Sequence, residues 1–219
     1  MTLHYLEQLD QQLTLAINSL HSTFTDPIMW FFSDKEVWIP MYIAIVGLMF
    51  WKLGWKATLL LLVAVGLTVL LCDQFSNVIK DLTQRIRPVN DPSMVKRGLH
   101  ILEWGGGFSF FSAHAANAFG ITLCTVPIFR KYAGDGWKLE RNLAHKIHDR
   151  IHERLHKPNI WARIYSFWMP LWALMVSVSR IFVGKHFLGD VIIGIIVGIL
   201  IGMLTSTLCR LAINRLAVR

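Results

Sequence analysis

Three short groups of charged and histidine residues could act together on one substrate, although they lie far apart in this 219-residue sequence. The first group holds two cations, the second a serine and a histidine, and the third a cation, a histidine and a carboxylate. Their members are Lys80 and Arg87, then Ser112, Ala113 and His114, then Arg180, His186 and Asp190. Lysine and arginine match the charge of an oxyanion, and arginine adds paired donors. The set therefore predicts chemistry at a phosphate group.

The spacing of the third group predicts an activated nucleophile. His186 and Asp190 are four residues apart, or one helical turn, so the carboxylate can bond one imidazole nitrogen. Such a bond fixes the tautomer of the histidine and raises the basicity of the other ring nitrogen. His114 remains available to protonate a leaving oxygen. We therefore expect His186 to attack, Asp190 to orient it, and His114 to act as the acid.

The remaining members of the three groups would bind the phosphate. Lys80 and Arg87 are seven residues apart and share one face if their helix continues, and Arg180 adds a third cation. Ser112 and the amide of Ala113 stand at an expected helix start, where backbone N–H groups favour an anion. We expect these five residues to hold the phosphate oxygens.

Long apolar runs predict the elements that position these groups. Hydrophobic residues make up 54% of the chain and charged residues 16%, whereas soluble domains carry about a quarter charged residues. This composition excludes a disordered chain and argues against an ordinary soluble enzyme. Five charge-free runs approach the length that a membrane-spanning helix needs: Val37–Trp51, Ala57–Cys72, Trp104–Phe129, Ile164–Ser179 and Val191–Cys209. The expected fold is all-α, a polytopic helical membrane bundle with five spanning helices.

The first 33 residues predict a different kind of helix. Apolar side chains recur there at helical spacing, with glutamate and glutamines between them: Leu6, Leu9, Leu13, Ile17 and Leu20. This pattern is typical of an amphipathic helix that lies in the membrane interface. We expect the helix to end at Asp26-Pro27. The following apolar residues 29–32 allow a sixth membrane segment, although they form a short run.

The distribution of lysine and arginine predicts the orientation. With five spanning helices, 14 of the 22 basic residues fall on the side of the C-terminus, and the other 8 fall on the side of the three chemical groups. Basic residues concentrate on the cytoplasmic side of membrane proteins. The net charge of +8 therefore indicates topology rather than nucleic-acid binding. In a bacterium, the site would face the periplasm from the inner membrane.

The histidines between Trp137 and Trp161 allow two interpretations. Four of them have spacings of 3, 4 and 4 residues, which would form a stripe on a helix and could bind a metal: His145, His148, His152 and His156. Leucine and isoleucine also recur every four residues in this segment, among many cations. That pattern is typical of a basic amphipathic helix on the inner membrane surface. We favour the second interpretation, with a cytoplasmic insertion at about 133–161 and no metal site.

Asp73 lies within an apolar run, seven residues before Lys80. A carboxylate inside a membrane is costly and should have a partner. It would either orient Lys80 from behind the site or form a structural hydrogen bond between two helices. The sequence supports both interpretations equally.

The order of the three groups resembles a known family. The pattern K-x6-R-P, then S-x-H, then S-R-x5-H-x3-D is similar to the signature of the type 2 phosphatidic acid phosphatase (PAP2) superfamily. The resemblance implies one PAP2-type domain over residues 1–219 that hydrolyses a phosphate ester or pyrophosphate without metal or cofactor. His186 would form a phosphohistidine, which water then hydrolyses. The second block departs from the usual P-S-G-H, because Ala113 replaces the glycine but keeps its backbone N–H.

The resemblance also implies an amphiphilic substrate whose headgroup phosphate reaches the membrane interface. Undecaprenyl pyrophosphate and the phosphates of lipid A are the first candidates, with phosphatidylglycerophosphate and phosphatidic acid as alternatives. A vanadate-dependent haloperoxidase shares the phosphate site, but the five apolar runs argue against that largely soluble class. A non-enzymatic lipid-phosphate binding or transport protein is a further alternative, against which the intact His186 and Asp190 pair argues. The expected partners are the lipid substrate and the bilayer, without nucleic acid, and the oligomeric state stays open.

Overall fold

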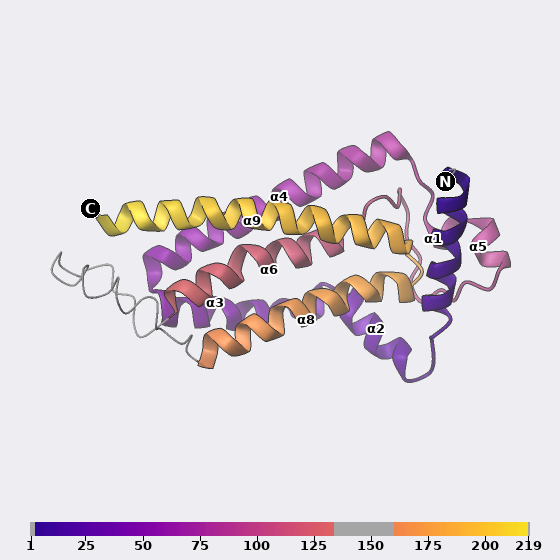
Figure 1. Ribbon diagram of the computed structural model, residues 1–219. Helices are drawn as coiled ribbons and strands as arrows, with labels where there is room; N and C mark the ends of the chain where they lie inside the picture. The colour runs from indigo at the N-terminus through magenta and orange to yellow at the C-terminus, as the bar shows by residue number, and fades with distance from the viewer. Residues whose placement is uncertain (1–2, 134–159, 219) are drawn as a thin grey trace.

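The long helices form an elongated bundle, and the short helices gather at one of its ends (Figure 1). The computed structural model describes residues 3–133 and 160–218, and every regular element in these two ranges is helical. The long helices are α3 (Ile39–Leu53), α4 (Trp55–Thr83), α6 (Ala113–Tyr132), α8 (Ile160–Phe182) and α9 (Leu188–Val218). The short ones are α1 (Leu3–Asn18), α2 (Thr25–Ser33), α5 (Pro92–Lys96) and the 3-10 turns Glu36–Trp38 and Pro88–Asn90. The four histidines of the expected insertion lie outside the described residues.

Each of the five apolar runs supplies one long helix, so the predicted all-α membrane bundle is confirmed. Within the described ranges, α3, α4, α8 and α9 are long and apolar enough to cross a membrane. The fifth helix, α6, is more polar; it packs against α4, α8 and α9, so neighbouring helices rather than lipid cover much of its surface. The number of spans stays a prediction, although α2 has only 9 residues. A helix of that length covers about 14 Å, half of the hydrocarbon core.

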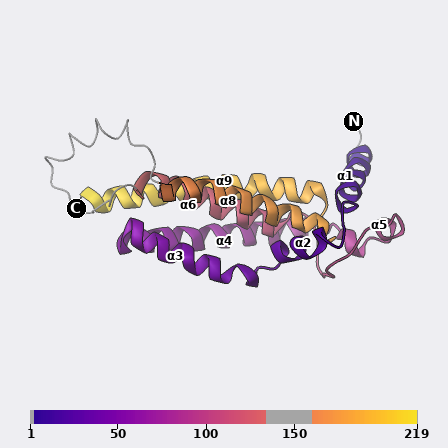
Figure 2. The same ribbon diagram turned by 90° about the horizontal axis from the view of Figure 1, so that it is seen from below.

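Two layers make up the bundle, with α3 and α4 in one and α6, α8 and α9 in the other (Figure 2). The main hydrophobic cluster lies between α3, α4, α6 and α8, and Leu61, Phe129 and Met169 are among its buried members. Many large apolar side chains of the same helices are exposed, such as Val63 and Phe167. Exposed apolar surface on this scale suits lipid contact rather than water.

A stripe of glycines brings α6 and α9 into backbone contact. Gly194, Gly198 and Gly202 stand on one face of α9, and a Cβ added at any of them would lie 2.2–2.5 Å from a backbone oxygen of α6. Small residues permit this approach, which gives membrane helices extensive van der Waals contact. The stripe fixes the register between α6 and α9, and the first turn of each of these helices carries a residue of the three groups. It was not predicted, since these glycines lie in an otherwise apolar run.

The Gly198→Ala variant is therefore expected to destabilise the bundle. Its new methyl group would lie 2.2 Å from the carbonyl oxygen of Ala116, so the two helices must separate. Overpacking of this kind costs about 1–3 kcal/mol in the free energy of unfolding. Thermal unfolding in detergent measures the effect. The matched control is Gly66→Ala in α4, where nothing lies within 4 Å of an added Cβ. Equal melting temperatures for both variants would contradict the role of the stripe.

The N-terminal helix lies across the end of the bundle at which the short helices gather (Figures 1 and 2). Its helical character confirms the prediction, and several of the expected apolar side chains are exposed: Leu6, Leu13 and Leu20. Its location in the membrane interface stays a prediction. Its polar residues Thr14 and Asn18, by contrast, are buried against the bundle. The predicted end at Asp26-Pro27 is wrong: α1 ends at Asn18, and the proline lies in the first turn of α2, where it is tolerated.

Asp73 has a partner on the neighbouring helix. The amide of Asn117 in α6 donates a hydrogen bond of 2.8 Å to its carboxylate. This contact joins α4 to α6 within the apolar region, where an unpaired carboxylate would be costly. The structure therefore favours the structural hydrogen bond of the two interpretations.

Candidate active site

The three chemical groups meet in one cavity at the end of the bundle that carries α1 and α2. The cavity has a volume of about 290 Å³. It is lined by Lys80, Arg87, Gly105, Gly106, Ala113, His114, Arg180, Lys185 and His186. This one cavity is therefore lined by all three expected cations, by both expected histidines and by Ala113, whose backbone N–H was expected to bind phosphate. Asp190 and Ser112 lie behind its wall.

Lys80 and Arg87 reach the cavity by a turn rather than along one helix. The helix α4 ends at Thr83, and Gln84 adopts a left-handed conformation with φ 47°. Arg87 follows in extended conformation, with φ −72° and ψ 150°. The helix does not continue to Arg87, so the two cations do not share a helix face. The predicted meeting of the two cations is nevertheless observed.

The arginines present buried donors that have no hydrogen-bond partner among the described residues. Arg180 is 3% exposed, and its Nη1 atom donates to the carbonyl oxygen of Ser33 at 3.2 Å and to the Ser33 hydroxyl. The same nitrogen lies 3.8 Å from Glu103 Oε2. The Nε atoms of Arg180 and Arg87 are buried and unpartnered in the parts of the chain that the structure describes. A buried, unsatisfied charged donor is costly, so this wall is built to receive an anion.

His186 is buried in a setting that keeps it neutral. It is 2% exposed, and burial lowers the pKa of its imidazole to about 4, although the carboxylate of Asp190 acts in the opposite direction. The cations Arg180 and Arg87 also favour the neutral form. A neutral imidazole has a free lone pair at physiological pH, which a nucleophile requires.

The hydroxyl of Ser109 contacts both His186 and Asp190. The closest atoms of the pair, Nδ1 and Oδ2, are 3.6 Å apart, which is an ion-pair distance but too long for a hydrogen bond. The hydroxyl of Ser109 donates to Asp190 Oδ2 and lies 3.5 Å from His186 Nδ1. The histidine therefore directs Nδ1 toward Asp190 and Ser109. Its other ring nitrogen, Nε2, is left for the cavity.

The carboxylate of Asp190 has several donors around it. The backbone N–H of Phe187 bonds to Oδ2 at 3.0 Å, and Arg85 Nη1 donates to Oδ1 at 2.6 Å. The side chain of Asp190 is fully buried, so it depends on these donors to stay ionised. Sequence reasoning missed Ser109 and Arg85. Arg85 stands two residues before Arg87, and that position inside the first group was the available signal.

Ser112 holds the start of α6 instead of lining the cavity. Its side chain accepts a bond from Ala115 N at 3.4 Å, and its own N–H donates to the carbonyl oxygen of Asp190 at 3.0 Å. The serine is fully buried. The expected helix start is confirmed, and it puts His114 in the first turn of α6. Contact between the Ser112 hydroxyl and a phosphate stays a prediction.

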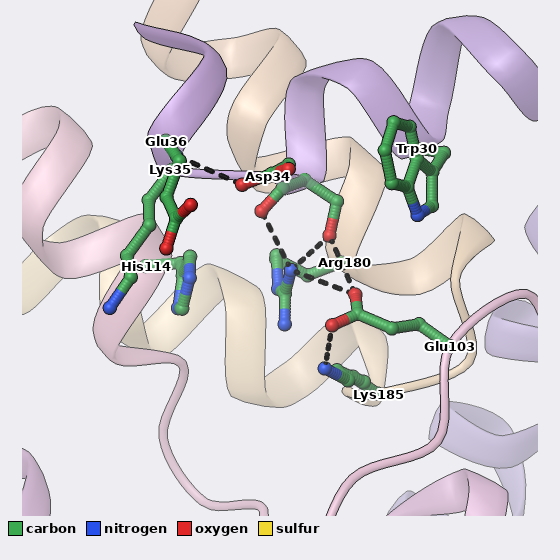
Figure 3. A pocket seen from close by; sticks show the side chains of 9 residues that line it. Trp30, Asp34, Lys35, Glu36, Glu103, His114, Arg180 and Lys185 are labelled. Carbon is green, nitrogen blue, oxygen red and sulfur yellow. Dashed lines mark hydrogen bonds and ion pairs between the residues drawn. The ribbon is translucent and has the colours of Figure 1, made fainter. Parts of the chain in front are cut away.

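A second polar cavity adjoins the first on the side of His114 (Figure 3). It has a volume of about 420 Å³ and shares His114, Arg180 and Lys185 with the first cavity. The rest of its lining is Trp30, Ser33, Asp34, Lys35, Glu36 and Glu103. Glu103 accepts from Lys185 and Ser33; burial tends to raise the pKa of this carboxyl, but these bonds and the charge of Arg180 hold it below its usual range. The six residues that this cavity does not share with the first were missed, because none of them belongs to the three groups.

The pH dependence of activity should report the environment of His186. Because the attacking form is the neutral one, kcat/KM is expected to stay high down to about pH 5 and to fall as the pH drops through about 4. A histidine with its ordinary pKa would lose activity near pH 6.5. The measurement is a pH profile of kcat/KM in detergent. An acid limb near 6.5 would show that His186 is not buried as the structure places it.

A cation-lined cavity at the end of a helical membrane bundle is the arrangement of an enzyme that handles phosphate at the membrane surface. The chain belongs to the PAP2 superfamily, whose model matches residues 57–212. It is 32% identical over 195 residues to a lipid A 4'-phosphatase of Bacteroides thetaiotaomicron, covering 88% of this chain and 73% of that protein. It is 28% identical over 197 residues to a lipid A 4'-phosphatase of Porphyromonas gingivalis, covering 88% and 70%.

Two solved structures share the fold. The crystal structure of a transmembrane PAP2-type phosphatidylglycerolphosphate phosphatase from Bacillus subtilis matches with a TM-score of 0.61 and 18% identity, over 96% of this chain and 87% of that one. The crystal structure of LpxE from Aquifex aeolicus matches with a TM-score of 0.54 and 18% identity, over 90% and 93%. The predicted family, the phosphoric ester hydrolase class and the multi-pass membrane fold are thereby confirmed. The protein is a membrane-bound phosphatase of this superfamily.

Proposed function

We propose that this protein removes a phosphate monoester from lipid A, or from a closely similar phosphorylated glycolipid, through a phosphohistidine on His186. One observation carries the proposal: a buried, neutral histidine lines a cavity together with three cations, Lys80, Arg87 and Arg180. Such a cavity attracts an anion and offers it a nucleophile at the same place. The lipid A 4'-phosphatases among its relatives support this substrate class.

The proposed reaction has two steps. In the first, Nε2 of His186 attacks phosphorus, and the bond from phosphorus to the leaving oxygen breaks. The leaving oxygen takes the electron pair of that bond and a proton from His114, which takes up this proton when the phosphate anion binds. In the second step, His114 takes a proton from water, whose oxygen attacks phosphorus, and the phosphorus–nitrogen bond breaks. Inorganic phosphate leaves, and both histidines return to their initial states.

The cations would supply most of the transition-state stabilisation. Charge in phosphoryl transfer spreads over three equatorial oxygens, so fixed donors around them lower the barrier. Arg180 and Arg87 line the cavity and would supply guanidinium donors, and Lys80 adds a point charge. None of these steps needs a metal ion, so we propose a metal-independent reaction without a cofactor.

The second cavity supports a sugar as the leaving group. It lies beside His114, the residue that would protonate the leaving oxygen, so the group that departs should occupy it. Carboxylates there can accept bonds from vicinal hydroxyls, and Trp30 offers an apolar ring face. The lining holds as many cations, Lys35, Arg180 and Lys185, as carboxylates, so its charge does not select against a second phosphate. The carboxylates that can accept from hydroxyls and the ring face of Trp30 favour a phosphorylated glycolipid over undecaprenyl pyrophosphate.

The charge distribution supports a periplasmic site in a bacterial inner membrane. The end of the bundle opposite the cavity carries a group of cations: Lys52, Lys56, Arg130, Lys131, Arg210 and Arg215. Basic residues mark the cytoplasmic end of membrane helices. We propose that the cavity faces the other side, where it meets headgroups of the outer leaflet.

Phosphate release by the purified protein in detergent tests the proposal. The substrates are lipid A, undecaprenyl pyrophosphate, phosphatidylglycerophosphate and phosphatidic acid, each with and without EDTA. We expect release from lipid A, unchanged by EDTA and absent in His186→Ala. Release that stops with EDTA would contradict the metal-independent mechanism. Faster release from a glycerophospholipid would contradict the assigned substrate. Binding of lipid A without release would show a binding protein instead.

A further inference from the structure

The N-terminal helix reaches the candidate active site through one arginine. Asp10 of α1 accepts a hydrogen bond from Arg85 Nη2 at 2.7 Å. The other terminal nitrogen of the same guanidinium, Nη1, donates to Asp190 at 2.6 Å. The second oxygen of Asp10 accepts from the backbone N–H of Gly189 at 2.7 Å. A line of alternating charges therefore runs from α1 to the carboxylate that orients His186.

We propose that Arg85, held in place by Asp10, is a positioning residue that balances the charge of Asp190 and thereby keeps His186 in its neutral, attacking form. The proposal rests on the proposed function, because it gives His186 the role of nucleophile. It assigns a task to an N-terminal helix that lies outside residues 57–212, the part of the chain that matches the family model.

The charge balance around Asp190 explains why an arginine is needed there. Asp190 is fully buried, so its negative charge must be compensated. His186 could supply that compensation only by accepting a proton, and an imidazolium has no lone pair with which to attack. Arg85 removes this competition, because it bonds to Oδ1 while Ser109 and the N–H of Phe187 bond to Oδ2.

The other groups around His186 leave this role to Arg85. The charged and titratable side chains that face the imidazole are Lys80 of α4, Arg87 in the turn after it, His114 of α6, Arg180 of α8, Lys185 beside it and Asp190 of α9. The four cations already oppose protonation of His186, and Asp190 is the anion that favours it. Arg85 contacts that anion directly from behind the cavity wall.

Further hydrogen bonds hold α1 against the end of α8 and the start of α9. Thr14 accepts from the N–H of Leu188 at 2.9 Å. Asn18 donates to the carbonyl oxygens of Ile181 and Phe182 at 3.2 and 3.1 Å. The loop that contains His186 is thus fixed on both of its sides by one helix. Arg85 also lies 4.0 Å above the ring of Phe187, which limits its freedom to move away from Asp190.

The pair of variants Arg85→Gln and Arg85→Lys tests the role of charge. In Arg85→Gln, we expect the plateau of kcat/KM to fall by about 10- to 100-fold, as when partners that orient a reactive group are lost. The acid limb of the pH profile should move up by about one unit, because the field of Asp190 on His186 is no longer balanced. Arg85→Lys keeps the charge, so its acid limb should stay at the wild-type pH and part of the plateau should return.

The variant Asp10→Asn tests the role of α1. We expect a loss of the order of tenfold in kcat/KM, because a charged hydrogen bond that holds Arg85 is removed. Its acid limb should not move up, since the lost charge is negative. The matched control is Glu7→Gln, the same chemical change at an exposed position one turn earlier on α1. This control should keep wild-type activity, and size-exclusion chromatography in detergent checks that each variant folds.

The outcomes separate this proposal from the proposed function. If His186→Ala remains active, the nucleophile assignment fails, and the role of Arg85 fails with it. A second outcome is that His186→Ala is inactive, while Arg85→Gln and Arg85→Lys lose activity equally and keep the acid limb at the wild-type pH. In that case Arg85 supports the structure of the site but does not set the protonation of His186. Unchanged kcat/KM in Asp10→Asn would show that α1 does not hold Arg85 in its working position. If Arg85→Gln does not fold, Arg85→Lys and Asp10→Asn still decide the question.

Discussion

The His186→Ala variant is expected to lose at least about 10⁴-fold in kcat, because removal of a nucleophile leaves only binding and electrostatic effects. The cations of the cavity stay in place in this variant, so the phosphate should still bind. The measurement is phosphate release from lipid A over a long incubation. Stabilisation by added inorganic phosphate, seen as a rise in Tm, serves as the control for an intact site.

Trapping the covalent intermediate gives a sharper form of the same test. A phosphorus–nitrogen bond on histidine survives alkali but breaks in acid. With a radiolabelled aryl phosphate, whose leaving group needs no proton, His114→Gln should form the intermediate and hydrolyse it slowly. Label should therefore accumulate on His114→Gln after an alkaline quench. His186→Ala should carry none.

Either of two results would overturn the nucleophile assignment. Substantial turnover by pure His186→Ala would show that water or another side chain attacks phosphorus. Label that resists acid would indicate a phosphoester on a serine or threonine. Ser109, whose hydroxyl lies 3.5 Å from His186 Nδ1, would then be the residue to replace.

The sequence was sufficient to predict the long helices and the members of the cavity, for physical reasons. Charge-free runs must form helices in a lipid environment, since each backbone N–H and carbonyl group needs a partner within the segment. Arg180 and Asp190 stand at run boundaries, where a membrane bundle keeps its polar chemistry. Helices of alternating direction then bring every second boundary to the same end.

Contacts between distant segments could not be predicted in this way. Arg85 joins two carboxylates that lie 75 and 105 residues away, and no local period encodes such pairs. The first helix was predicted to be amphipathic and interfacial, and nothing in its pattern showed that its polar residues Thr14 and Asn18 are buried against the bundle. An amphipathic pattern shows that a helix has two faces but not which surface each of them meets.

The Arg180→Lys variant is expected to lower kcat/KM by about 10²- to 10³-fold, the effect of removing one well-placed donor to a developing oxyanion. The guanidinium of Arg180 has two tasks in the structure. Its Nη1 atom is held by Ser33, and the residue also lines the cavity that would hold the phosphate. A lysine has one nitrogen on a flexible stem and cannot serve both tasks. Kinetics with lipid A measure the loss.

Two further variants identify which task of Arg180 matters more. Arg163→Lys makes the same change at an exposed position near the other end of α8, and it should leave activity unchanged. Ser33→Ala keeps the guanidinium but removes one of its two contacts with Ser33, so its loss should be smaller than that of Arg180→Lys. If Ser33→Ala instead matches Arg180→Lys, then the position in which Ser33 holds the guanidinium accounts for the loss in Arg180→Lys. In that case the short helix α2, which ends at Ser33, belongs to the working site together with the four long helices.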